Sequence, residues 1–106
     1  MDTTFIVVFI TVDSPVTAQK MMDKLLAERK AACVNIIPKV ESHYRWQGKI
    51  ESDDELLLIV KTRITLLDEI ITLVKENHPY TIPEIIAMPI VGGNADYLQW
   101  IEKETS

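Results

Sequence analysis

The sequence predicts an α+β fold with the element order β-α-β-β-α-β and an added C-terminal helix. Two apolar runs, at 5–10 and 56–60, are continuous rather than alternating, as expected for central strands of a sheet. Two further predicted strands contain Pro38 and Pro89. Proline donates no hydrogen bond to a ladder, so these strands are expected at the edges. This is the split βαβ plan of ferredoxin-like folds, a sandwich in which the strand order is four-one-three-two.

The first strand leads into a helix whose start is marked by Ser14 and Pro15. A serine side chain caps the free N–H groups of a helix, and proline fits the first helical position. Apolar residues then recur at helical spacing and predict the buried stripe. The stripe consists of Ala18, Met21, Met22, Leu25 and Leu26. At this spacing, the methionine pair is expected to fill the core rather than to bind a metal.

The longest predicted element is a β-hairpin over 32–63 that folds back at the Trp-Gln-Gly-Lys sequence of 46–49. Its first arm alternates apolar and polar residues, apart from Ile37, which predicts a half-buried strand. Its second arm contains the apolar run, which predicts a strand covered on both faces. Each arm of roughly fourteen residues would reach about 45 Å. Because such an arm projects beyond a small core, we expect another copy of the chain to cover it.

The remaining elements are a second helix, a last strand and a short terminal helix. Thr65 is the expected cap of the second helix, and Pro79 ends it. The last strand is expected at 84–91, and Asn94 should cap the terminal helix. The buried stripe of the second helix is expected to be Leu67, Ile70, Ile71 and Val74. With no repeat or linker in the sequence, residues 1–106 are expected to form one domain.

Composition argues against several classes of partner. The chain has 11 basic and 16 acidic residues, and its net charge of −5 disfavours nucleic acid and anionic membranes. No apolar run is long enough to span a bilayer. The single cysteine, Cys33, forms no intramolecular disulfide, and no signal peptide is recognisable. A cytoplasmic location is therefore expected.

A few side chains are candidates for chemistry. Cys33 and His78 are a conceivable nucleophile and base or a metal-ligand pair, although a structural role is equally open. Lys61, in line with the apolar run, is expected to pair with Glu84 or with an anionic ligand. The acidic stretch 51–55 is expected to be solvated. Because no second group at fixed spacing supports either Cys33 or Lys61, the sequence favours a binding protein over an enzyme.

Several separate blocks, in the same order along nearly the whole chain, resemble the CutA divalent-cation-tolerance family. The first is Leu-Ala-Glu-Arg-Lys-Ala-Ala-Cys-Val-Asn-Ile-Ile-Pro at 26–38. The others are Ser-x-Tyr-x-Trp-x-Gly-Lys-Ile at 42–50, Glu-x-x-Leu-x-x-Lys-Thr at 55–62, His-Pro-Tyr-x-x-Pro-Glu-Ile at 78–85 and Tyr-Leu-x-Trp-Ile at 97–101.

The resemblance implies a cytoplasmic homotrimer, similar in architecture to the PII signalling proteins, in which long hairpins and edge strands pair between subunits. It also implies a link to copper and other divalent ions. In members that bind copper, a proposed site uses a cysteine of the first strand and two adjacent histidines before Pro-Tyr. This sequence has Ile10 and Asn77 at two of those positions, so His78 is the one candidate metal ligand that remains.

We therefore predict a trimer that binds copper, another divalent metal ion or a small ligand at an inter-subunit cleft. The alternative is a PII-like signalling or scaffold trimer that binds a metabolite or a protein partner and affects metal tolerance only indirectly. The predicted cleft mixes aromatic, cationic and anionic groups, as small-ligand sites do. It comprises Cys33, Asn35, Tyr44, Trp46, Lys61, His78, Tyr80, Glu84 and Trp100.

Overall fold

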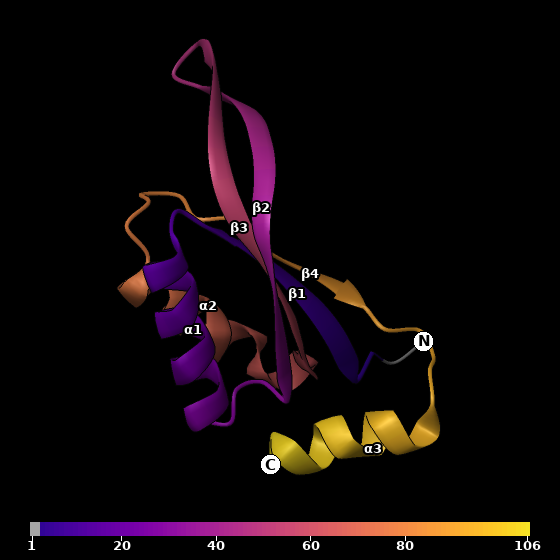
Figure 1. Ribbon diagram of the computed structural model, residues 1–106. Helices are drawn as coiled ribbons and strands as arrows, with labels where there is room; N and C mark the ends of the chain where they lie inside the picture. Colours follow the sequence, from indigo (N-terminus) through magenta and orange to yellow (C-terminus); the bar gives the residue numbers. More distant parts are fainter. Residues whose placement is uncertain (1–2) are drawn as a thin grey trace.

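The structure, a computed structural model that describes residues 3–106, contains a four-stranded antiparallel sheet with the strand order β2-β3-β1-β4. This confirms the predicted order, with the first and third strands in the centre. Figure 1 shows α1 and α2 on one side of the sheet and α3 at the end away from the hairpin tip. The elements are β1 (Phe5–Val12), α1 (Pro15–Ala27), β2 (Cys33–Trp46), β3 (Lys49–Arg63), the 3₁₀ turn η1 (Ile64–Leu66), α2 (Leu67–Asn77), β4 (Ile85–Pro89) and α3 (Ala95–Glu104).

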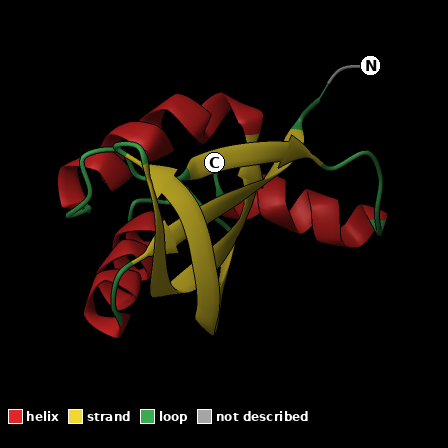
Figure 2. Ribbon diagram, turned by 90° about the horizontal axis from the view of Figure 1, so that it is seen from above, coloured by secondary structure: helices red, strands yellow, loops and turns green. Residues whose placement is uncertain are grey.

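The core lies between the sheet and the two helices α1 and α2. Alternate residues of the central strands are fully buried there, because successive side chains of a strand point to opposite faces. From β1 and β3 these are Ile6, Val8, Ile10, Leu58 and Val60, and from the helices Met21, Leu25, Ile70 and Val74. In Figure 2 the helices, in red, flank the yellow sheet.

The opposite face of the sheet differs from the prediction that the central strands are covered on both sides. Its residues on β1 and β3, including Phe9 and Ile59, are only half-buried. On β4, Ile86 is 54% exposed and Met88 is 55% exposed. We call this surface the open face; it comprises Val7, Phe9, Ile37, Leu57, Ile59, Ile86 and Met88. In the described part of the chain, residues 3–106, α1 and α2 cover only the other face, although the residues of the open face are as apolar as those of the core.

The hairpin forms as predicted. Its two-residue turn, Gln47-Gly48, has positive φ at both positions (48° and 79°), which matches the right-handed twist of the strands. Trp46 is therefore opposite Lys49 in the register. The register shifts between Ile37 and Val40, where Pro38 lies, so β2 contains a β-bulge at this point. The longest dimension of the molecule is 44 Å, and Figure 1 shows that the hairpin accounts for its projecting end.

The helix boundaries confirm two predicted caps and correct one. Ser14 accepts a hydrogen bond from the Thr17 N–H, and Asn94 accepts one from Asp96. Thr65 does not cap α2; it lies within the 3₁₀ turn, so the α-helix begins two residues later without a side-chain cap. The last strand is also shorter than predicted, at Ile85–Pro89. In α2 the buried stripe includes Leu73, while Ile71 is only half-buried.

Two arginines attach α3 to the rest of the chain. Arg63, at the end of β3, donates to the hydroxyl and carbonyl oxygens of Thr105, at 2.8 and 2.7 Å. Arg29 donates to the carbonyl oxygens of Lys103 and Ser106, each at 2.9 Å. These bonds satisfy carbonyl groups at the C-terminus of the helix. They hold α3 close to the start of β2 and the end of β3.

Candidate functional site

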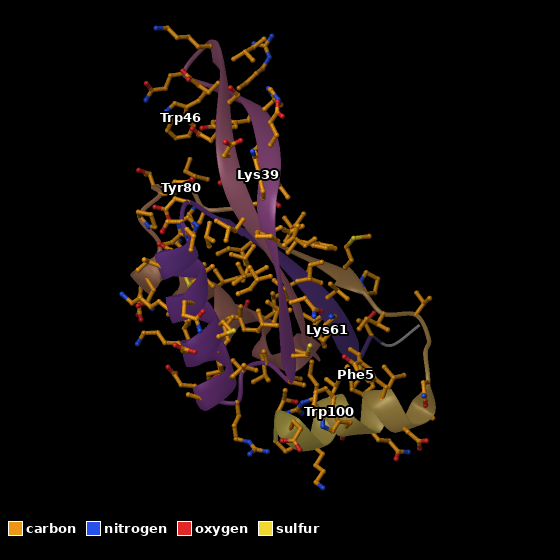
Figure 3. The ribbon with its side chains drawn as sticks, in the orientation of Figure 1. Phe5, Lys39, Trp46, Lys61, Tyr80 and Trp100 are labelled. Carbon is orange, nitrogen blue, oxygen red and sulfur yellow. The ribbon has the colours of Figure 1, made fainter. Side chains whose placement is uncertain are left out.

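The predicted cleft residues lie in two groups at opposite ends of the hairpin. Trp46 is paired with Lys49 and Cys33 with Lys61, so twelve residues of β3, or about 40 Å of strand, separate the two pairs. In Figure 3, Trp46 and Tyr80 lie toward the hairpin end, whereas Lys61 and Trp100 lie near α3. One chain therefore does not bring the nine residues into a single site. Whether a neighbouring copy does so stays a prediction.

The first group, which we call the lysine cluster, consists of Cys33, Asn35, Lys61, Tyr97 and Trp100. Lys61 donates to the side-chain oxygen of Asn35, and its Nζ is 4.0 Å from the Cys33 sulfur. The lysine does not pair with Glu84, because that residue precedes β4 at the far end of the sheet. Among residues 3–106, Lys61 has no carboxylate partner. The contacts of its ammonium group are with the Asn35 side-chain oxygen and the Cys33 sulfur, so the predicted anionic ligand stays open as the alternative to Glu84.

Tyr97 is a member of this cluster that was not among the predicted site residues. Its ring lies 5.4 Å from the ring of Trp100, centre to centre. Burial raises the pKa of Tyr97, and the nearby Cys33 adds to the shift through its charge and a hydrogen bond. Tyr97 and Trp100 are three residues apart on a predicted helix, and this spacing in the sequence indicates that their rings are neighbours.

His78 is separated from Cys33 and has a structural environment. It is only 8% exposed, and its Nε2 lies 2.7 Å from the Thr11 carbonyl oxygen. Its Nδ1 accepts the Tyr80 backbone N–H at 3.1 Å. Because Nδ1 accepts, Nε2 must carry the proton and donate to Thr11. Both nitrogens of the neutral ring are occupied, so a metal ion at His78 would have to displace one of these bonds.

The nucleophile–base pairing of Cys33 with His78 is excluded within one chain. The histidine bonds to Thr11, which is opposite Leu57, whereas Cys33 is opposite Lys61. Leu57 and Lys61 are four residues, or about 13 Å, apart along β3.

The second group lines a cavity of about 670 Å³ between residues 42–46 of β2, in the projecting part of the hairpin, and the loop 80–84 that follows His78. We call it the hairpin groove; Tyr44, Trp46, Glu55, Tyr80 and Glu84 are the lining residues used below. Its size is within the range of small-ligand pockets. Four of these five residues were predicted as cleft residues, and Glu55 was not.

Glu55 corrects the expectation that the whole acidic stretch 51–55 is solvated. Its side chain is 6% exposed, whereas the four residues before it are exposed. It directly precedes the apolar run, which places it where the projecting part of the hairpin meets the body of the sheet. The burial of Glu55 could have been predicted from this position next to the apolar run.

Two tyrosine hydroxyls in the groove contact carboxylates. Tyr44 donates to Asp53, and this bond, with burial and the neighbouring carboxylates, raises the pKa of Tyr44 to about 12. Burial raises the pKa of Tyr80 well above its usual value, and a hydrogen bond with Glu55 and the charge of that residue add to it. The ring of Tyr80 also lies 4.6 Å from that of His78. Neighbouring carboxylates contribute to both pKa shifts, although the largest cause is the Asp53 hydrogen bond for Tyr44 and burial for Tyr80.

Residues 3–106 contain no group of three or more His, Cys, Asp or Glu side chains placed to hold one metal ion. Within the same part of the chain, no helix is long and apolar enough to cross a membrane.

The fold and this arrangement define a class: a ferredoxin-like domain with a projecting hairpin and aromatic and charged residues at both of its ends. The family model of the CutA1 divalent ion tolerance protein matches residues 6–104. The chain therefore belongs to the CutA1 divalent-ion-tolerance family, which confirms the resemblance. It is 50% identical over 99 residues to the divalent-cation tolerance protein CutA of Thermus thermophilus, covering 93% of this chain and 96% of that protein.

Other relatives are longer. Protein CutA 1, chloroplastic, of Oryza sativa is 48% identical over 100 residues, which are 94% of this chain but 56% of that protein. The chain thus spans about half the length of the plant relatives it matches.

Solved structures agree closely with the fold. CutA1 from Oryza sativa superposes with a TM-score of 0.94 at 46% identity, covering 98% of this chain and 95% of that one. The periplasmic divalent cation tolerance protein CutA from Archaeoglobus fulgidus also gives 0.94, at 38% identity, covering 96% and 99%. Because the relatives' names include chloroplastic and periplasmic proteins, the cytoplasmic location stays a prediction.

Proposed function

We propose that this CutA-family protein acts as a homotrimer without catalytic activity, which binds a divalent metal ion such as copper, or a small ligand, at a cleft between subunits. One observation carries the proposal: the open face lies between the lysine cluster and the hairpin groove and is apolar. Burying such a surface against another copy is favourable by roughly 25 cal/mol for each Å² of apolar area removed from water. Exposed apolar patches of this kind mark interaction surfaces.

The arrangement of the two groups suits a head-to-tail assembly. A neighbour packed on the open face in this way would place its lysine cluster beside the hairpin groove of the first chain. Head-to-tail contacts close into rings when the rotation allows it, and family resemblance suggests three subunits. The cleft would then combine the Lys61 ammonium group of one subunit with the aromatic and acidic groups of the next.

A metal ion in such a cleft would draw its donors from more than one subunit. Glu84 and Cys33 are the other candidate donors. The Cys33 sulfur has two long contacts, with the Asn35 side-chain oxygen at 3.9 Å and the Lys61 Nζ at 4.0 Å, and it lies far from Glu84 in a single chain. Carboxylate and thiolate ligands suit different metals, so the identity of the metal would follow from which of them contributes.

The test is native mass spectrometry of the protein, alone and after addition of Cu(I), Cu(II) or Zn(II). The proposal expects a trimer and about three bound metal ions or, if no metal binds, a metal-free trimer that binds a small ligand. The variant His78→Ala tests the predicted ligand, and His43→Ala is its matched control, because His43 is exposed on the hairpin. Equal metal uptake by both variants would remove His78 as a ligand, and a monomer at all concentrations would contradict the assembly.

A second candidate function is a PII-like signalling or scaffold role, favoured by the exposed hairpin tip. Ile50, next to the turn, is 74% exposed, and Trp46 on the facing arm is 41% exposed, so the tip presents apolar surface to solvent. A stoichiometric partner recovered by pull-down, and lost in Ile50→Ser but retained in Val16→Ser, would support this function. The control Val16 is 78% exposed on α1, away from the hairpin. Equal recovery by both variants would contradict a role of the tip.

A further inference from the structure

Alternate residues of β3 form a stripe of mixed charge along the open face. Glu55, Leu57, Ile59 and Lys61 follow one another at intervals of two residues, so their side chains point to the same face of the strand. Leu57 and Ile59 belong to the open face. The stripe therefore has an acidic end, an apolar middle and a basic end. Its charged ends are six residues, or about 20 Å, apart along β3.

The acidic end of the stripe is continuous with the hairpin groove. Glu55 lines this groove together with Thr11, whose register partner on β3 is Leu57 of the stripe. The Glu55 side chain is 6% exposed. It has a hydrogen bond with the Tyr80 hydroxyl, which supplies a dipole but no positive charge. The groove and the open face are thus parts of one surface.

The basic end of the stripe is Lys61. Its ammonium group contacts the Asn35 side-chain oxygen and the Cys33 sulfur, neither of which belongs to a carboxylate. Arg63 continues the alternation toward the end of β3, but its guanidinium group donates to Thr105. Lys61 is therefore the cation at this end that is available to a group outside the chain.

Neither charged end of the stripe joins an ion pair within residues 3–106. Both ends have hydrogen bonds, so the group that each of them lacks is an opposite charge and not a donor or an acceptor. A second copy that covers the open face would bury both charges further. A buried charge without a charged partner is costly, so a stable contact on this face has to match Glu55 and Lys61 with charges of opposite sign.

A second copy of the same chain carries both of the required charges. In a head-to-tail contact, the basic end of one stripe meets the acidic end of the next, and the apolar middle of each stripe is covered. Such complementary charges fix the orientation of two surfaces and disfavour other arrangements. A free anion at Lys61 would match one end only and would leave Leu57 and Ile59 uncovered.

We propose that Lys61 of one subunit forms a salt bridge with Glu55 of the next, and that this contact sets the orientation in which neighbouring open faces meet. The inference rests on the proposed function and deepens it, because it assigns the carboxylate that Lys61 meets across the interface. The hairpin groove is then completed by the neighbouring copy, which contributes the cation at its buried end.

Exchange of the two charges tests this salt bridge. Lys61→Glu and Glu55→Lys each place like charges together at the interface, so each should weaken assembly at least about tenfold. The variant with both exchanges again has opposite charges and should recover most of the assembly. Sedimentation at several concentrations measures the change. Lys20→Glu, Asp23→Lys and their combination are matched controls, because both residues are exposed on α1, and all three should assemble as the parent protein does.

Neutral variants give a second test that does not place a lysine at the buried position. Should Glu55→Lys fail to fold by circular dichroism, Glu55→Gln, Lys61→Met and their combination carry the same question. If the two side chains pair, the loss of assembly in the combined variant is smaller than the product of the two single losses. A loss equal to that product would contradict the salt bridge.

The outcomes separate the salt bridge from the assembly. If the parent protein is a trimer and the double exchange assembles no better than either single exchange, the salt bridge alone is wrong. The same holds if the single exchanges assemble as well as the controls on α1. A parent protein that stays a monomer at every concentration would contradict the proposed assembly and the salt bridge together.

Discussion

The two faces of the sheet are built from the same strands but have different environments. Along β1, Val8 is fully buried beneath the helices, while its neighbours Val7 and Phe9 on the open face are only half-buried. Along β4, Ala87 packs against the core, while Ile86 and Met88 are more than half exposed. The two faces are alike in sequence, because nearly every position of these strand segments is apolar. The difference shows that, within residues 3–106, α1 and α2 cover one face of the sheet, whereas the covering of the open face by another copy stays a proposal.

The largest expected effect on stability is at the face of the sheet that α1 and α2 cover. Leu58→Ala removes a fully buried side chain and should lower the free energy of unfolding by about 2–5 kcal/mol, because a cavity remains. Leu26 was predicted in the buried stripe of α1 but is 40% exposed, so Leu26→Ala is the matched control and should change the free energy of unfolding by less than about 1 kcal/mol. Urea unfolding measures both. Similar losses would mean that the layer under α1 and α2 is not the main core.

The next effect concerns the open face. Met88→Lys places a charge where the chain is already exposed, so the single chain should keep its fold and its helical circular dichroism. Assembly should be weakened at least tenfold, because a charge buried in an apolar interface loses its hydration. Sedimentation at several concentrations measures the change, and Val16→Lys on α1 is the control. An unchanged oligomer in Met88→Lys would show that another surface holds the copies together.

A smaller effect is expected where α3 lies at one end of this face. Arg63→Met removes two hydrogen bonds to Thr105 while keeping most of the side-chain volume. The loss should be about 1–2 kcal/mol of stability, and α3 should exchange its amide hydrogens faster. Hydrogen exchange with mass spectrometry locates the change. In Lys103→Met, the exposed control on the same helix, the exchange of α3 should stay as in the parent protein.

The smallest effect is the alkaline titration of the hairpin groove. The pKa of Tyr44 is raised from 10.0 to about 12, mainly by its hydrogen bond with Asp53. The folded chain therefore holds this proton more tightly than the unfolded chain. The resulting stabilisation is complete below pH 10.0 and is lost as the pH rises to about 12. Tyrosinate absorbance should show a late-titrating group that is absent in Tyr44→Phe and shifted to lower pH in Asp53→Asn; no shift would contradict the bond.

The local chemistry of the sequence determined much of the fold. Ser14 and Asn94 were recognisable as helix caps, Gln47-Gly48 as a turn, and Pro38 and Pro89 as markers of edge strands, because each depends on backbone geometry within a few residues. The continuous apolar runs likewise identified the central strands. Thr65 was misassigned because a 3₁₀ turn competes with a capped helix start over the same few residues.

Tertiary structure decided the candidate site. The sequence marked Cys33, Lys61, Trp46 and Tyr80 as site residues, but it did not show that the hairpin register places them at opposite ends of β3. Nor did it show that both nitrogens of His78 are occupied, since its partner Thr11 is distant in sequence. Burial of Glu55 depends on a loop from another part of the chain. Residue types and local spacing can be read from a sequence. Hydrogen-bond partners, burial and the distance between site residues are set only when distant segments pack together.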